Sequence, residues 1–72
     1  MNNIYVDLKS EIYPLFIIKK AVSDYSQIAE ITVKTMDNST LCFFKDGQFS
    51  ADLVKNEFCN YLIEILSSKV ES

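Results

Sequence analysis

Apolar and polar residues alternate in two short stretches of the chain, residues 4–8 and 29–35. A period of two is typical of a β-strand that buries one face. A third stretch, residues 40–45, is rich in side chains that favour strands, and residues 37–39 before it have the chemistry of a turn. The pattern therefore predicts three strands, of which the last two form a β-hairpin.

The register of this hairpin depends on the length of its turn. A two-residue turn at residues 37–38 places Cys42 and Phe44 in the core. A three-residue turn places Leu41 and Phe43 there instead, because a slip of one residue exchanges the two faces of a strand. Both registers remain open, and the aromatic residue left out of the core is expected on the opposite sheet face, near the first strand.

A helix is predicted from about residue 14 to residue 25, since Pro14 suits a first helical turn. With Ile18 at its centre, the expected buried stripe also contains Leu15, Ala21, Val22 and Tyr25. Phe16 falls nearly opposite this stripe. We expect it to fold back under the preceding loop, with an exposed contact to a partner as the alternative.

A longer helix is predicted from about residue 51 to residue 69, with Ser50 as its N-cap. Its buried stripe is centred on Phe58 and contains Ala51, Val54, Tyr61, Leu62 and Ile65. A second apolar row lies roughly 80 to 140° round the helix and consists of Cys59, Ile63, Leu66 and Val70. We expect this row to pack against the first helix, and a docking or dimer surface is the alternative. Leu53 belongs to neither row and is interpreted as a scattered surface residue.

The order strand, helix, strand, strand, helix predicts a single α+β domain over residues 1–72. A right-handed crossover makes the first two strands parallel, and the third lies most simply between them, antiparallel to both. The expected architecture is a three-stranded mixed sheet of order 1-3-2, a split β-α-β arrangement with two helices packed on one face. The first and second strands are then edges, where another chain can add a strand.

Composition removes several classes of function. The chain has 72 residues without His, Arg or Trp, which excludes an imidazole base, a Cys/His zinc site and a Ser-His-Asp triad. Seven lysines against ten carboxylates give a net charge of −3 and a pI near 4.7, which disfavours nucleic-acid binding. Carboxylate pairs such as Asp46 and Asp52 are better explained as turn and cap residues than as an acid/base pair. We therefore expect no enzyme, no cofactor and no metal site.

The longest apolar run, residues 15–18, is far shorter than the ~20 residues that span a bilayer. Together with an N-terminus unlike a signal peptide, this predicts a cytoplasmic protein without membrane contact. Cys42 and Cys59 are expected to be free, reduced and structural, because two cysteines in a chain without an export signal seldom form a disulfide. They form no Cys-Xaa-Xaa-Cys spacing, so no metal or thioredoxin-type site is expected.

Three features resemble a known family: Tyr13 before the first helix, Ala21 within it, and the Phe-Cys-Asn-Tyr-Leu stretch at residues 58–62. With them, residues 6–66 resemble the HxsD proteins of the His-Xaa-Ser peptide-modification systems. Members of that family accompany radical-SAM maturases and a short, ribosomally made precursor peptide. The chain departs from the family in lacking an Arg late in the second helix. The resemblance implies an accessory role and assigns no catalytic residue.

The expected function is that of a non-catalytic accessory protein that binds a radical-SAM maturase or a precursor peptide. The alternative is a small homodimeric structural protein. The sheet edge, the second helix and the resemblance together indicate the candidate partner-binding residues, which are Tyr5, Tyr13, Cys59, Asn60, Ile63, Leu66 and Val70.

Overall fold

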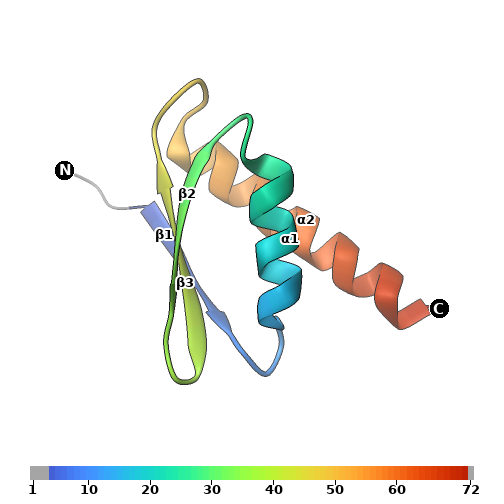
Figure 1. Cartoon of the computed structure of the whole chain (residues 1–72). Helices are drawn as coiled ribbons and strands as arrows, with labels where there is room; N and C mark the ends of the chain where they lie inside the picture. The colour runs from blue at the N-terminus through green and yellow to red at the C-terminus, as the bar shows by residue number, and fades with distance from the viewer. Residues whose placement is uncertain (1–3, 72) are drawn as a thin grey trace.

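A computed structural model describes residues 4–71, with side chains for residues 4–68. The elements follow the predicted order: β1 Ile4–Lys9, α1 Leu15–Tyr25, β2 Glu30–Thr35, β3 Ser39–Lys45 and α2 Ala51–Glu71. The three strands form one sheet, and both helices lie on the same face of it (Figure 1). The predicted α+β architecture is confirmed.

The sheet has the expected strand order, β1-β3-β2. β3 pairs with β1 on one side and with β2 on the other, and both pairings are antiparallel. The predicted pairing is confirmed, and because both ladders are antiparallel the sheet is an antiparallel one and not a mixed one. β1 and β2 do run in the same direction, as the crossover through α1 requires, but β3 separates them, so they share no hydrogen bonds.

The hairpin between β2 and β3 has the two-residue turn. The Met36 N–H donates to the Ser39 carbonyl at 2.7 Å, which closes the turn, and Val33 pairs with Cys42. Cys42 and Phe44 are consequently buried in the core. Phe43 lies on the opposite face, with its ring centroid 5.5 Å from that of Tyr5. We call this uncovered side of the sheet the open face.

The core is centred on Phe58 of α2, which is fully buried. Its ring meets those of Tyr25 and Phe44 edge to face, at centroid distances of 5.6 and 5.3 Å. A buried aromatic side chain of this kind contributes about 1.5–3 kcal/mol through burial alone. The buried residues come from the sheet and from both helices: Leu8, Ile17, Ile18, Ala21, Thr40, Cys42, Phe44, Ala51, Val54, Phe58 and Leu62.

The buried side of α1 contains most of the predicted stripe, since Ile18 and Ala21 are buried and Val22 and Tyr25 pack against the core. Ile17 is buried, whereas Leu15 is 38% exposed and Phe16 is 61% exposed. The reason is that α1 packs against α2 on the side that carries Ile17 and, two turns later, Asp24, which accepts a hydrogen bond from Tyr61 of α2. The expectation that Phe16 is covered by the preceding loop is wrong.

α2 begins where the sequence predicts. The Ser50 hydroxyl accepts a hydrogen bond from the Leu53 N–H at 3.3 Å, so Ser50 is the N-cap. The Asp46 carboxylate accepts the Ala51 N–H at 2.7 Å, which satisfies a second free donor of the first turn. These two bonds fix the direction in which the chain enters α2.

Candidate functional site

The outer edge of β1 presents backbone groups that pair with no other strand among residues 4–71. The Ser10 N–H donates to the Asn38 carbonyl, which fixes the hydrogen-bonding side of each residue along β1. Because the sides alternate in an antiparallel ladder, Tyr5, Asp7 and Lys9 direct their N–H and C=O groups away from β3. Their side chains lie on the open face, where Lys9 and Asp7 form an exposed ion pair at 3.6 Å.

The second apolar row of α2 does not pack against α1, contrary to expectation. Contact with α1 is made by Tyr61, whose hydroxyl donates to Asp24 and whose ring lies 5.6 Å from that of Tyr25. Two residues along an α-helix are separated by about 200°, so Cys59 and Ile63 are turned to the opposite side. We call the side formed by Cys59, Ile63 and Leu66 the outer flank of α2.

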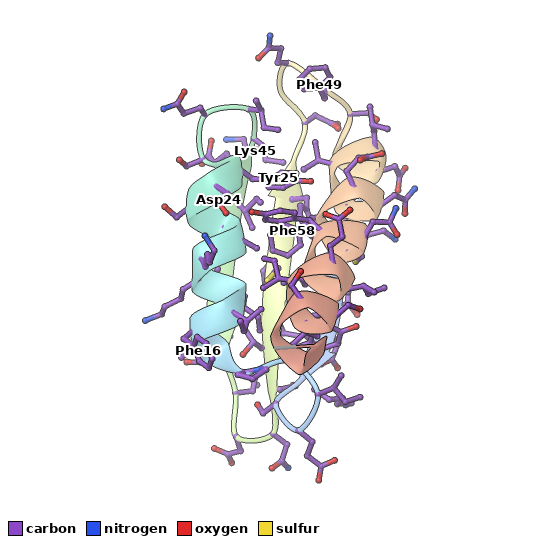
Figure 2. All side chains as sticks on the ribbon, turned by 90° about the vertical axis from the view of Figure 1, so that its right-hand side faces the viewer. Phe16, Asp24, Tyr25, Lys45, Phe49 and Phe58 are labelled. Atoms are coloured by element: carbon purple, nitrogen blue, oxygen red, sulfur yellow. The ribbon has the colours of Figure 1, made fainter. Side chains whose placement is uncertain are left out.

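This outer flank lies toward β1. α2 packs over β1 and β3, and α1 lies beside it on the other side (Figure 2). Cys59 and Leu66 are half-buried, whereas Ile63 is 54% exposed. The free edge of β1 is therefore bordered on its helical side by an apolar strip of α2.

The other predicted site residues are distributed differently. Tyr5 is 51% exposed on the open face, so it lies at the β1 edge. Asn60 is exposed and borders the outer flank, three positions before Ile63. Tyr13 is half-buried against the core. The side chain of Val70 lies outside the described residues.

Both cysteines are free, and both lie near the junction of α2 and the sheet. Burial raises the pKa of the Cys42 thiol to about 11, with a smaller contribution from the neighbouring Cys59. Burial also raises the pKa of Cys59, against the lowering effect of the nearby Lys55. Raised thiol pKa values leave little reactive thiolate at neutral pH.

A cleft that the sequence did not indicate lies at one end of the two helices. It has a volume of about 200 Å³ and is lined by Tyr25, Ile28, Phe49, Leu53, Val54 and Glu57. Leu53 is thus part of an apolar cluster and not a scattered surface residue. Helical periodicity could not reveal this cleft, since Ile28 and Phe49 belong to loops. We call it the apolar cleft.

Two structural findings bear on other classes of site. Within the described part of the chain, no group of His, Cys, Asp and Glu side chains could hold a metal ion. None of the helices described here has the length and apolar character needed to cross a membrane.

No family model matches the chain, and no curated protein or solved structure matches it either. The resemblance to the HxsD proteins therefore rests on the residues named above from the sequence.

Proposed function

We propose that this chain is a non-catalytic accessory protein of a peptide-maturation system, which binds an extended segment of its partner along the edge of β1. The resemblance to the HxsD proteins makes that partner a radical-SAM maturase or its precursor peptide. We place the protein in the cytoplasm, where thiols such as Cys42 and Cys59 stay reduced.

The observation that carries this proposal is the position of the β1 edge beside the outer flank of α2. An added strand finds outward-facing N–H and C=O groups at Tyr5 and Asp7 and an outward-facing N–H at Lys9. The Lys9 carbonyl already accepts hydrogen bonds from the Ile12 and Tyr13 N–H groups, so the receptive edge ends there. Every second side chain of that strand points toward the helical face, where Cys59, Ile63 and Leu66 offer apolar contacts. The edge thus supplies hydrogen bonds, and the flank supplies selectivity for apolar residues.

Charges on β1 restrict the partner further. Side chains that lie opposite each other on one face of a sheet interact, and opposite charges there are stabilising. A partner strand therefore needs a basic residue opposite Asp7, an acidic residue opposite Lys9, and an aromatic or β-branched residue opposite Tyr5. Its sequence alternates these residues with apolar ones.

Asp7 also bears on the alternative, a homodimer formed through β1. Two antiparallel copies of β1 that overlap over residues 5–9, with Tyr5 of one copy opposite Lys9 of the other, place one Asp7 directly opposite the other on the open face. Like charges in this arrangement destabilise a strand pair. This argument disfavours that register of a homodimer and supports a partner of different sequence.

The test is a quantitative pull-down from the native host with three variants. Asp7→Pro removes an outward N–H without removing a bond to β3, and Ile63→Glu places a charge on the outer flank. Ile12→Glu is the matched control, because Ile12 is 59% exposed in a loop and undergoes the same substitution. Circular dichroism confirms that each variant is folded.

We expect the unmodified chain to enrich a radical-SAM protein or a short precursor peptide. Asp7→Pro and Ile63→Glu should each reduce this enrichment at least about tenfold, equivalent to roughly 1.4 kcal/mol of binding free energy, and Ile12→Glu should retain it. Recovery of this chain alone, with twice the monomer mass at high concentration, contradicts the proposal and supports the homodimer.

A further inference from the structure

The apolar cleft is held open by backbone hydrogen bonds in the loops that form it. The N–H groups of Ile28 and Ala29 both donate to the Tyr25 carbonyl at 3.0 Å. On the other side, the Gly47 N–H donates to the Phe49 carbonyl at 3.1 Å. Both loops are therefore fixed without a partner, so the cleft is formed in the free protein (Figure 2 shows Phe49 and Tyr25 at the same end of the helices).

The cleft leaves a large apolar surface in contact with water. Ile28, Phe49 and Leu53 are 44%, 42% and 49% exposed. All three line one cavity of about 200 Å³. Pockets for whole small molecules are larger, roughly 300 to 1,000 Å³. The dimensions of the cleft therefore match one large apolar side chain.

The rim of the cleft is acidic. Glu57 is the charged residue among those that line it. Glu57 and Glu64 are both near enough to Tyr25 to raise the pKa of its hydroxyl, in addition to the larger effect of burial. A third carboxylate, that of Asp24, also lies between the two helices, where it contacts Tyr61. Among the described residues it forms an ion pair with Lys20 at 3.5 Å. An incoming positive charge is therefore attracted to this rim.

We infer that the apolar cleft binds a partner segment in which a large apolar side chain is flanked by Lys or Arg. The apolar side chain fills the cavity between Ile28, Phe49 and Leu53, and the adjacent cation pairs with Glu57. This contact is separate from the β1 edge, because Leu53 and Glu57 lie on the α1 side of α2 and the outer flank faces away from α1. The inference thus does not depend on the proposed function.

The test is an NMR titration of the full chain with three short probe peptides. The first probe is acetyl-Lys-Phe-Lys-amide, the second is acetyl-Glu-Phe-Glu-amide, and the third is acetyl-Lys-Ala-Lys-amide. We expect saturable shifts of the Ile28, Phe49 and Leu53 amides with the first probe only. The second probe tests the charge of the rim, and the third tests the apolar cavity.

Two variants localise the binding. Leu53→Lys fills the cavity with a charged side chain and should abolish the shifts. Glu57→Gln changes no packing and should weaken the affinity about two- to fivefold, as expected for an exposed ion pair. Glu11→Gln, on the loop after β1, is the matched control and should bind like the unmodified chain. Since Glu57→Gln keeps the fold, it remains informative if Leu53→Lys does not fold.

Equal shifts with the lysine and glutamate probes overturn the inference, as does the absence of shifts at these three amides. A further contrary outcome is self-association. If sedimentation shows a dimer that Leu53→Lys dissociates, a second copy of this chain covers the cleft in place of a basic segment.

Discussion

The hydroxyl of Tyr61 on α2 donates a hydrogen bond to the carboxylate of Asp24 on α1, joining residues 37 positions apart in the sequence. The ring of Tyr61 also packs against Tyr25, so the contact combines an apolar and a polar part. This contact sets the rotation of α2 about its axis. With Tyr61 turned toward α1, Ile63 and Cys59 must face outward.

The substitution Tyr61→Phe should raise the pKa of Asp24. The hydrogen bond from Tyr61 is the largest cause that lowers the pKa of this carboxyl below its ordinary value of 3.8, and the charge of Lys20 makes a smaller contribution. Carboxyl chemical shifts followed by NMR during an acid titration measure the change. Tyr5→Phe is the control, because Tyr5 packs on Phe43 at the open face. An unchanged Asp24 pKa in Tyr61→Phe contradicts the assignment.

The same contact should give the stability a defined pH dependence. Folding lowers the pKa of Asp24, so this carboxylate stabilises the folded state at any pH above the ordinary carboxyl pKa. That stabilisation is lost as the pH falls through the lowered pKa. Folding raises the pKa of Tyr61, chiefly through its bond to Asp24, so that contribution is lost as the pH rises through the raised value. Urea unfolding of the unmodified chain and Tyr61→Phe should therefore differ most between these two limits.

Amide hydrogen exchange should alternate along β1. The N–H groups of Val6 and Leu8 point to β3, whereas those of Tyr5, Asp7 and Lys9 point to the free edge. We expect the first set to exchange at least about tenfold more slowly than the second, measured by NMR in deuterated buffer. Uniform exchange along the strand contradicts this register.

Proline substitutions along β1 test the same alternation of N–H directions through its effect on stability. Val6→Pro removes a bond to β3 and leaves the Cys42 carbonyl without its strand partner, which should destabilise the fold by about 1–3 kcal/mol. Asp7→Pro should destabilise it less, because the lost N–H faces solvent. Urea denaturation of both variants measures the difference, and equal losses argue against the pairing.

The two thiols should differ in reactivity. At pH 8 iodoacetamide should modify Cys59 first, because Cys59 is half-buried, whereas Cys42 is fully buried and its pKa is raised to about 11. Cys42 should react only when the chain unfolds, so urea should accelerate its modification. Mass spectrometry of the digested protein identifies the modified residue, with Cys59→Ser used to isolate Cys42. Modification of Cys42 before Cys59 contradicts this expectation.

The start of α2 should depend on both of its capping side chains. Ser50→Ala and Asp46→Ala should each destabilise the fold by about 0.5–2 kcal/mol. The effect of Asp46→Ala should be larger, since its bond to the Ala51 N–H is shorter and its acceptor is charged. Asp46→Asn keeps an acceptor and should recover part of the loss in thermal unfolding. If Asp46→Ala is neutral, the cap has been misassigned.

The sequence predicted those parts of the fold that depend on local periodicity. The alternation around Val33 identified β2, and the apolar spacing around Phe58 identified the buried side of α2. The sequence left two hairpin registers open, one with Cys42 and Phe44 in the core and one with Leu41 and Phe43 there. The choice between them depends on whether the turn contains two residues or three. Such a choice depends on tertiary packing, which a single strand does not encode.

Features that involve two elements were predicted less well. The burial of Ile17 follows from where α2 lies relative to α1, and the periodicity of α1 alone does not contain that information. That periodicity did place Phe16 opposite the buried stripe, and only its expected cover by the preceding loop was wrong. The second apolar row of α2 was recognised from its spacing, but its expected packing against α1 was wrong, because α2 turns Tyr61 toward α1 instead. The apolar cleft was missed because Ile28 and Phe49 come from loops without regular spacing.

The central position of β3 also has a kinetic consequence. Pairing β3 with β2 closes only the two-residue turn, whereas pairing it with β1 closes a loop that contains all of α1 and β2. The entropy lost on closing a loop increases with its length, and long-range pairings slow folding. We therefore expect the hairpin to form early and β1 to join the sheet last. The strand proposed to receive a partner is then also the strand whose docking completes the fold.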